Sequence, residues 1–324
     1  MQNKVCILLG SYNGALYLGE QIQSIVDQTY RNWELLIRDD GSSDETCSII
    51  DSYSMLDDRI QVVTDGDGNL GACGNFSRLL EFALAQGYEY YAFADQDDVW
   101  LPEKLSMMLE SMKLEESAMP EQPLLVHSDM EVVDSSLKTI NSSFMRYQGV
   151  ANEDHDPLRV LLVQNYVTGC ATLINRALAE MAIPFPKEVL MHDWWLALCA
   201  ALFGQIIYID RPLLKYRQHN SNEIGAQSLK SHLNPFKTSW INHWIRGRDN
   251  LVQSLHQARV LAERIKMHDP ENKNLEPIVA YSNLLNQSPV NRLIKLNTLG
   301  VHAQSKLRQA LLLSRLLFSR SSKE

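Results

Sequence analysis

The sequence predicts an α/β protein whose mainly parallel, Rossmann-like sheet is flanked by helices and followed by a helical C-terminal extension. Short apolar or β-branched runs alternate with helical patterns over the first half of the chain, which is typical of βαβ units in a parallel sheet. Polar, glycine-containing segments follow two of these runs, and an acidic segment follows a third. From about residue 228 onward the pattern is helical, so the extension is expected to contain no strand.

The first four expected strands are short apolar runs at residues 5–9, 34–38, 60–64 and 90–94. Residues 16–27, 44–55 and 75–86 lie between them and are expected to form helices. In the third of these helices the apolar positions follow helical spacing: Phe76, Leu79, Leu80, Ala83 and Leu84. Asp44 and Glu45 place negative charge in the first turn of the second, as the helix macrodipole favours.

The pattern loosens after Trp100, where a helix is expected to begin near Pro102. Further strands are expected at residues 124–127, 171–174 and 206–209, the last preceded by an apolar helix over residues 194–203. In the extension, helical stretches are expected to break at the prolines, which are Pro235, Pro270, Pro277 and Pro289. The expected domains are therefore residues 1–229, with the sheet, and residues 230–324, with helices alone.

The composition is that of a globular protein, with 45% hydrophobic and 21% charged residues in a chain of 324. No apolar run approaches the roughly 18 to 20 residues needed to span a bilayer, and no cleavable leader pattern opens the chain. The five cysteines are widely separated and form no CxxC pair, which argues against a disulfide framework or a zinc site. A cytoplasmic location is therefore expected.

Charge divides the chain into two parts. Residues 1–229 contain 15 Lys and Arg against 33 Asp and Glu, a balance of −18. Residues 230–324 contain 15 against 6, a balance of +9. An acidic body would repel a phosphate backbone, so nucleic acid is not an expected partner. The basic tail favours an anionic surface or the acidic body itself as its partner.

Three polar clusters follow the expected strands: residues 10–14 after the first strand, 39–44 after the second and 95–98 after the fourth. In an open α/β sheet the ligand site lies beyond the carboxyl ends of the strands, so these clusters are expected to be neighbours. Each cluster is also ordinary turn chemistry on its own. Their joint occurrence at one sheet edge favours a functional site.

The cluster at residues 95–98, Asp-Gln-Asp-Asp, holds three carboxylates at the end of a buried run. Like charges this close need a compensating cation or several hydrogen bonds. Oxygen ligands with spare coordination positions suit Mg²⁺ or Mn²⁺, which usually retain substrate phosphates as further ligands. The alternative is that Asp97 or Asp98 merely caps the helix expected near Pro102. The tetrapeptide by itself leaves both interpretations open.

The ordered set of motifs resembles glycosyltransferase family 2, the inverting nucleotide-sugar transferases of the GT-A fold. The resemblance covers about residues 3–225 and is closest to a bacterial rhamnosyltransferase-like branch. The motifs, in order, are Ser-Tyr-Asn-Gly at 11–14, Asp-Asp-Gly-Ser-Ser-Asp at 39–44, Asn-Leu-Gly at 69–71 with Asn75-Phe76, Asp-Gln-Asp-Asp-Val-Trp at 95–100, His-Ser-Asp at 127–129, His-Asp-Trp-Trp at 192–195 and Tyr-Arg-Gln-His-Asn at 216–220.

The resemblance implies roles for individual residues. The loops at 11–14 and 39–44 would hold the nucleoside, with Tyr12 packing on the base and Asp40 binding the base or ribose. Asp95 and Asp97 would correspond to the DxD element that binds a divalent cation, Mg²⁺ or Mn²⁺, and the donor diphosphate. The full set of donor-binding candidates is Ser11, Tyr12, Asn13, Asp40, Asn75, Asp95 and Arg217, and the metal candidates are Asp97 and His219.

Asp193 is the candidate base, because inverting transfer requires a group that takes the proton from the acceptor hydroxyl. Its aromatic neighbours Trp194 and Trp195 would form a wall for a sugar and raise the basicity of the carboxylate. The alternative is that Asp193 is only the N-cap of the helix at 194–203. His192 is expected to have a structural or orienting role.

The implied activity is metal-dependent transfer of a sugar from a nucleoside diphosphate to a hydroxyl of a bacterial surface polysaccharide, such as O-antigen, or of a lipid-linked glycan. Rhamnose from dTDP-rhamnose is the leading donor. A UDP-sugar transferase of the same family and a catalytically silent binding subunit are the alternatives. Residues 291–320 are basic and amphipathic. They are a candidate for peripheral contact with the inner face of the membrane, where a polyprenyl-linked acceptor would lie, or for packing on the catalytic domain or another subunit.

Overall fold

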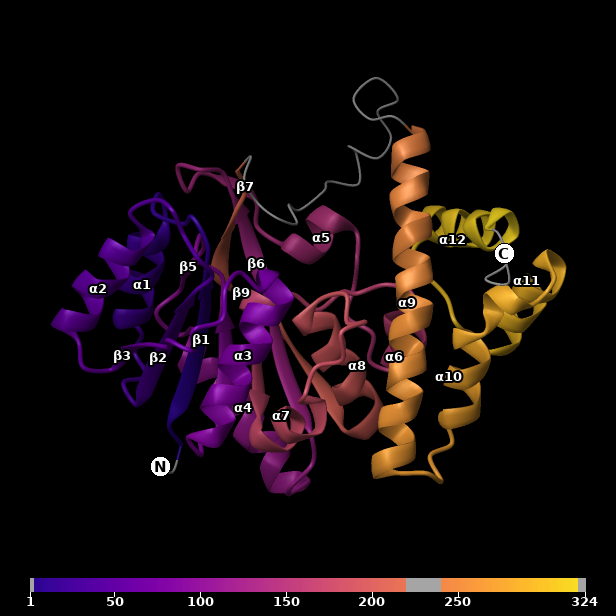
Figure 1. Cartoon of the computed structure of the whole chain (residues 1–324), viewed down its shortest axis with the longest axis horizontal. Helices are drawn as coiled ribbons and strands as arrows, with labels where there is room; N and C mark the ends of the chain where they lie inside the picture. Colours follow the sequence, from indigo (N-terminus) through magenta and orange to yellow (C-terminus); the bar gives the residue numbers. More distant parts are fainter. Residues whose placement is uncertain (1–2, 220–239, 320–324) are drawn as a thin grey trace. The chain divides into compact units, whose positions relative to one another are not determined.

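The computed structural model describes residues 3–219 and 240–319. The chain divides into two compact units. The first comprises residues 1–147, 167–185 and 191–226 and contains the sheet; the second comprises residues 148–166, 186–190 and 227–324 and is helical (Figure 1). The last division lies close to the expected boundary at 229. The two shorter segments of the second unit come from the part of the chain that was assigned to the first domain.

The sheet has nine strands in the described residues, in the order β3-β2-β1-β4-β8-β6-β9-β5, with β7 paired to β6. The pairs among β1, β2, β3 and β4 are parallel, as is the pair β6–β9, whereas β8, β5 and β7 pair in antiparallel fashion. The strands are β1 (Val5–Ser11), β2 (Trp33–Asp39), β3 (Ile60–Val62), β4 (Tyr90–Ala94), β5 (Val99–Trp100), β6 (Leu124–Val133), β7 (Thr139–Asn141), β8 (Thr172–Asn175) and β9 (Gln205–Arg217).

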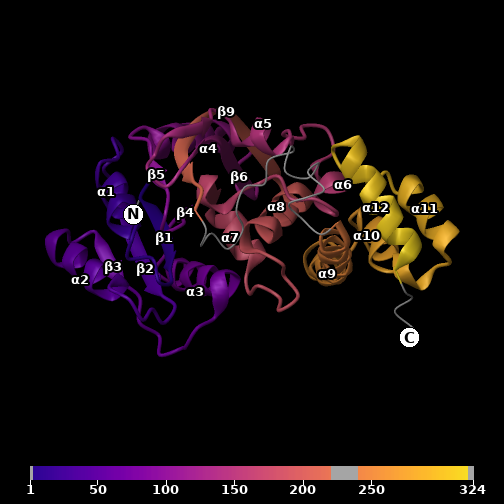
Figure 2. The same cartoon turned by 90° about the horizontal axis from the view of Figure 1, so that it is seen from above.

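Helices cover both faces of the sheet. Alternate β1 residues Val5, Ile7 and Leu9 are buried in one core with residues of α1 (Leu18–Val26), α2 (Thr46–Leu56) and α4 (Lys104–Ala118). On the other face lie α3 (Gly71–Ala85), α7 (Arg176–Ala182) and α8 (His192–Phe203). Figure 2 shows α3 on the opposite side of β1 and β2 from α1. Parallel strands buried on both faces explain the continuous apolar runs of the sequence.

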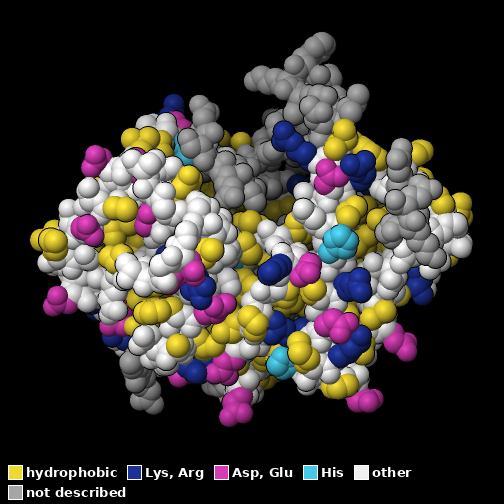
Figure 3. Space-filling model, in the orientation of Figure 1, with side chains coloured by type: hydrophobic (Ala, Val, Ile, Leu, Met, Phe, Trp, Pro, Cys, Tyr) yellow, Lys and Arg dark blue, Asp and Glu magenta, His cyan; other side chains and the backbone are white. Residues whose placement is uncertain are grey.

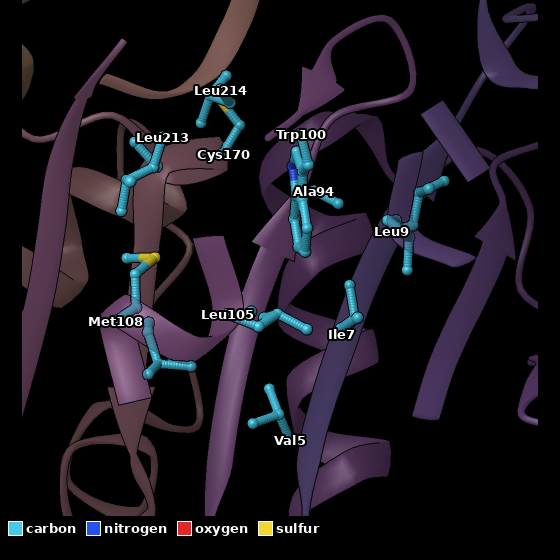
Figure 4. Packing of buried hydrophobic residues seen from close by; sticks show 14 of the residues in the cluster. Val5, Ile7, Leu9, Ala94, Trp100, Leu105, Met108, Cys170, Leu213 and Leu214 are labelled. Atoms are coloured by element: carbon cyan, nitrogen blue, oxygen red, sulfur yellow. The ribbon is translucent and has the colours of Figure 1, made fainter. Parts of the chain in front are cut away.

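The core on the α1 and α4 side reaches the end of β4. Figure 4 shows Trp100 beside Ala94, with Cys170 next to Leu214 and Leu105 below them. Cys170 lies in the short turn Gly169–Ala171 that precedes β8. The acidic segment 95–98 therefore lies directly on a tightly packed apolar layer.

The helical unit contains α6 (Pro157–Leu161), α9 (Trp240–His268), α10 (Leu275–Ser282), α11 (Pro289–Thr298) and α12 (Lys306–Phe318). The buried Tyr281 hydroxyl donates to the Leu162 carbonyl at 3.0 Å and lies 2.9 Å from the Ser254 hydroxyl, which ties the segment 148–166 to α9 and α10. The buried Arg292 guanidinium donates to the carbonyls of Leu316 and Ser319, at the end of α12. Figure 3 shows Lys, Arg and apolar side chains together on the surface of this unit.

The expected α/β architecture with a helical extension is confirmed. Strands β6 and β9 are longer than expected. The elements that were not expected are β5, β7, α5 (Phe144–Gln148), α6 and α7. Pro277 does not break a helix, because it lies in the first turn of α10, where the missing N–H has no helical partner to lose. Pro235, Asn220 and Arg320 lie outside the described residues. Within the described residues, no helix is both long enough and apolar enough to cross a membrane.

Candidate functional site at the carboxyl ends of the parallel strands

The side chain of Gln96 joins the loop after β1 to the loop after β4. Its Oε1 atom accepts from the Ser11 hydroxyl at 3.1 Å and from the Tyr12 N–H at 2.9 Å, and its Nε2 atom donates to the Tyr12 carbonyl at 3.0 Å. A Cβ atom at Gly14 would lie 2.1 Å from Gln96 Oε1, so this close approach requires glycine. The Tyr12 ring is left 50% exposed at the edge of the sheet.

The loop after β2 is fastened to the same segment. Asn13 donates its N–H to the Ser42 hydroxyl at 2.7 Å, and its Oδ1 accepts from the Ser43 N–H at 2.8 Å. Gly14 donates its N–H to the Thr46 hydroxyl at 2.8 Å. The three expected clusters are therefore brought together at one sheet edge.

Asp40 and Asn75 are buried beneath this edge. The Asp40 carboxylate accepts from Arg38 Nη1 at 2.7 Å and from the N–H groups of Leu70 and Gly71 at 2.8 Å each. Asn75 accepts from Arg38 Nη1 at 3.3 Å and donates to the Arg38 carbonyl. Both side chains thus contact the protein's own backbone and Arg38, and they fix the start of α3 against the end of β2.

The Asp97 carboxylate pairs with His219, which follows strand β9 in the chain. Its Oδ2 atom lies 2.7 Å from His219 Nε2, and the His219 ring lies 4.8 Å from the Tyr17 ring. Helix α4 begins at Lys104 with Glu103 at its N-cap position. The alternative that Asp97 or Asp98 caps this helix is therefore wrong.

Asp95 and Asp98 lie beside Cys170. One ligand atom from each of the three side chains lies within 4.8 Å of the other two. Asp98 is fully buried, and its Oδ1 atom accepts from the Arg217 N–H at 3.2 Å. Burial, followed by the charges of Asp97 and Asp95, raises the pKa of the Asp98 carboxyl well above its usual value.

Arg217 is 1% exposed, and its guanidinium contacts several parts of the protein. Nε donates to the Asp97 carbonyl at 2.8 Å, Nη1 donates to the Ser135 carbonyl at 2.8 Å, and Nη2 pairs with Glu20. The guanidinium also lies 4.4 Å from the centre of the Tyr17 ring. These contacts hold the backbone at Asp97 rather than present a free cation at the surface.

Asp193 lies in the first turn of α8, which begins at His192 with Met191 at the N-cap position. The alternative that Asp193 is the N-cap is therefore wrong. Its Oδ2 atom accepts from the Gly169 N–H at 3.0 Å. Because Gly169 precedes Cys170, this bond places Asp193 next to the turn that contacts Asp95 and Asp98.

His192 is buried against two aromatic rings, with centroid distances of 4.1 Å to Phe76 and 5.3 Å to Phe93. Neither ring nitrogen has a hydrogen-bond partner among the residues that the structure describes. Burial lowers the pKa of His192 to about 3. A Cβ atom at Gly169 would lie 2.4 Å from His192 Nε2, so His192 and Gly169 fit closely beside the candidate base.

Sequence reasoning assigned no role to Gln96, Lys104 or Cys170, which all belong to this site. Gln96 stands inside the acidic motif, so its position in the motif could have indicated a role at this site. Lys104 stands between Trp100 and Leu105 in an apolar stretch, which was a usable sign of a buried lysine. Cys170 comes from a distant segment, and nothing in its neighbourhood of the sequence predicts its contact with Asp95 and Asp98.

A family model described as glycosyl transferase family 2 matches residues 6–181. The chain is 30% identical over 230 residues to UDP-Glc:alpha-D-GlcNAc-diphosphoundecaprenol beta-1,3-glucosyltransferase WfgD of Escherichia coli, which covers 70% of this chain and 81% of that protein. It is 26% identical over 234 residues to dTDP-rhamnosyl transferase RfbG of Shigella flexneri, which covers 67% and 74%.

Two solved structures share the fold. Staphylococcus aureus TarS residues 1–349, in complex with UDP-GlcNAc, matches with a TM-score of 0.52 and 17% identity over 96% of this chain and 87% of that one. Mannosyltransferase PcManGT of Pyrobaculum calidifontis, in complex with GDP-Man and Mn²⁺, matches with a TM-score of 0.52 and 20% identity over 96% and 78%.

Proposed function

Because this chain belongs to glycosyl transferase family 2, with the GT-A fold that its motifs predicted, we propose that it transfers a sugar with inversion from a nucleoside diphosphate to an acceptor hydroxyl. Family membership makes the chain a glycosyltransferase. The observation that carries the more specific proposal is the joining of three polar loops at one sheet edge by Gln96, Asn13 and Gly14. This edge is where an α/β sheet binds its ligand.

The donor nucleoside is proposed to bind against the exposed ring of Tyr12, because an aromatic face is suited to stacking on a base. Ser11 and Asn13 hold the Tyr12 loop, while Asp40 and Asn75 fix the neighbouring loop from below. These residues act by shaping the pocket.

For the sugar itself, rhamnose from dTDP-rhamnose is supported by the similarity to dTDP-rhamnosyl transferase RfbG. The similarity to glucosyltransferase WfgD supports UDP-glucose as the second candidate.

Asp97 and His219 are proposed to hold a divalent cation, and Asp95 lies beside Asp98 and Cys170. Their carboxylate oxygens and one imidazole nitrogen suit Mg²⁺ or Mn²⁺, and the 2.7 Å separation of Asp97 Oδ2 and His219 Nε2 would allow both atoms to bind one cation at neighbouring positions. When bound, a cation would offset the negative charge that develops on the departing diphosphate. Arg217 contacts the Asp97 backbone, and Tyr17 packs against both His219 and Arg217. We therefore assign Arg217 the role of positioning Asp97 and His219, in place of direct contact with the diphosphate.

Asp193 is proposed to take the proton from the acceptor hydroxyl as that oxygen attacks the anomeric carbon. The Gly169 N–H donates to Oδ2 and the Trp194 N–H donates to Oδ1, so the carboxylate is held in one orientation. The bond to the anomeric carbon forms as the bond to the diphosphate oxygen breaks, and the proton passes to Asp193.

The acceptor is proposed to be a hydroxyl of a surface polysaccharide or of a lipid-linked glycan. Fewer basic residues of the tail are proposed to contact the membrane than the sequence pattern implied. Arg292 and Arg308 donate to backbone carbonyls within the helical unit instead. Exposed apolar side chains are left at Val290, Ile294 and Phe318. Co-sedimentation with anionic liposomes tests this patch: Ile294→Glu should reduce binding of the full chain, and equal binding would remove the membrane contact.

A donor screen tests the proposal as a whole. The chain is heated with dTDP-rhamnose, UDP-glucose, UDP-GlcNAc or GDP-mannose, each with and without Mn²⁺. A true donor at about 100 times its Kd should stabilise the fold by about 2.7 kcal/mol, which is a readily measured rise in Tm. Stabilisation that requires Mn²⁺ supports the assignment. No stabilisation by any nucleotide sugar would overturn it, and binding without transfer would indicate a catalytically silent subunit.

A further inference from the structure

Lys104 is a fully buried lysine at the first position of α4, in the sheet-containing unit. Its Nζ atom donates to the Cys170 carbonyl at 2.9 Å and lies 3.4 Å from the centre of the Trp100 ring. A buried ammonium group is costly unless nearby negative charge or an aromatic face compensates it. Lys104 therefore needs an electrostatic reason for its position.

That reason is the acidic cluster on the other side of Cys170. The Cys170 backbone accepts from Lys104, while its side chain lies within 4.8 Å of ligand atoms of Asp95 and Asp98. Asp98 is fully buried, and its Oδ2 atom has no hydrogen-bond partner among the residues that the structure describes. Burial lowers the pKa of Lys104 to about 7, and Cys170, Asp98 and Asp95 act in the opposite direction to favour the charged amine.

We propose that Lys104 is an internal counter-charge that partly offsets the Asp95–Asp98 carboxylates and so weakens the affinity of the empty donor site for a divalent cation. The proposal rests on the proposed function, since it concerns the cation of that site. Lys104 touches neither donor nor acceptor; it is a positioning residue that acts through Cys170 and the acidic segment. A weakly held cation would enter with the donor diphosphate and leave with the nucleoside diphosphate, in keeping with the usual reliance of Mg²⁺ on substrate phosphates.

The direction in which cation affinity changes when Lys104 is replaced separates a counter-charge role from a merely structural one. If Lys104 only supports the fold, its removal loosens the acidic segment and weakens cation binding. If Lys104 is a counter-charge, its removal leaves the carboxylates more negative and tightens cation binding. Because charges interact more strongly in a buried site than in water, we expect a change of about tenfold in Kd.

The experiment measures Mn²⁺ affinity of the full chain, without donor, at pH 6, where Lys104 is charged, by electron paramagnetic resonance of free Mn²⁺. Lys104→Gln keeps a hydrogen-bond donor but removes the charge, and Lys113→Gln on the same helix is the matched control. We expect Lys104→Gln to bind Mn²⁺ about tenfold more tightly and Lys113→Gln to bind as the wild type does. Unchanged or weaker binding by Lys104→Gln would overturn the proposal. If the wild type itself binds no Mn²⁺, with or without donor, the cation assignment fails as well.

A double-mutant cycle in urea unfolding tests the same interaction if Lys104→Gln is too unstable for the binding experiment. Removing one partner of a buried charge pair leaves the other uncompensated, whereas replacing both can be nearly neutral. The double variant Lys104→Gln with Asp98→Asn should therefore recover much of the urea midpoint that Lys104→Gln loses. Losses that add in the double variant would show that the two charges do not interact, and would contradict the counter-charge role.

Discussion

Replacing His192 should change how the stability of the protein depends on pH. The imidazole is buried between Phe76 and Phe93, and its two nitrogens have no hydrogen-bond partner among the residues that the structure describes. Protonation in this place would bury an uncompensated charge, so the folded protein keeps His192 neutral far into the acid range. His192→Leu removes the titrating group and retains an apolar side chain of similar volume.

The size of the effect follows from the two pKa values. The pKa of His192 is about 3 in the folded chain against 6.5 for an unperturbed imidazole. Between these values the unfolded chain binds a proton that the folded chain does not, so the free energy of unfolding falls as the pH falls. The slope is about 1.4 kcal/mol per pH unit, or about 2 kcal/mol between pH 6.5 and pH 5. Above about pH 7.5 His192 contributes almost no slope.

The assay is urea-induced unfolding of the wild type and of His192→Leu at pH 7.5, 6.5, 5.5 and 5.0. All other titrating groups are shared, so the difference between the two curves isolates His192. We expect the wild type to lose about 2 kcal/mol more than the variant over the acidic interval, with the two curves becoming parallel only towards pH 7.5. Parallel curves over the whole range would refute the buried, neutral state of His192.

Three further predictions concern the donor site. Gly14→Ala would place a Cβ atom 2.1 Å from Gln96 Oε1 and break the bridge between the loops after β1 and β4. Donor affinity measured by calorimetry should therefore fall by at least about tenfold, and an affinity equal to that of the wild type would contradict the bridge. Tyr12→Ala should lose stacking worth roughly 1–3 kcal/mol of donor binding while Tyr12→Phe retains it, and equal affinity of all three proteins would remove Tyr12 from the base site. Asp97→Ala should abolish the Mn²⁺ dependence of donor binding, and an unchanged response to Mn²⁺ would remove Asp97 from the cation site.

Much of the sheet and of its functional edge could be predicted from the sequence because both depend on local patterns. Short apolar runs mark the parallel strands, and parallel strands bring their carboxyl ends to one side. The segments of Tyr12, Asp40 and Asp97 were therefore expected to meet before any contact was known. The hydrogen bonds of Gln96 that join two of these loops depend on tertiary packing, which a short sequence pattern does not predict.

The remaining features depend on contacts between distant segments. Cys170 lies 66 residues from Lys104 in the chain, yet its carbonyl accepts from that lysine. The helical unit recruits residues 148–166, because the Tyr281 hydroxyl donates to the Leu162 carbonyl. In the tail, the regular spacing of basic residues indicated an amphipathic surface. Arg292 instead caps the end of a helix, since a guanidinium can satisfy several carbonyls at once.

Sugar transfer by the wild type and by Asp193→Asn tests directly whether the protein is an inverting transferase with Asp193 as its base. Both proteins are supplied with the donor found by the thermal screen, Mn²⁺ and a short-chain lipid-linked glycan as the acceptor probe. Donor affinity is measured on the same samples. We expect an inverted anomeric linkage from the wild type, and from Asp193→Asn unchanged donor binding with transfer reduced on the order of 10²-fold or more. Near-normal turnover by Asp193→Asn, or a product with retained configuration, would contradict this assignment.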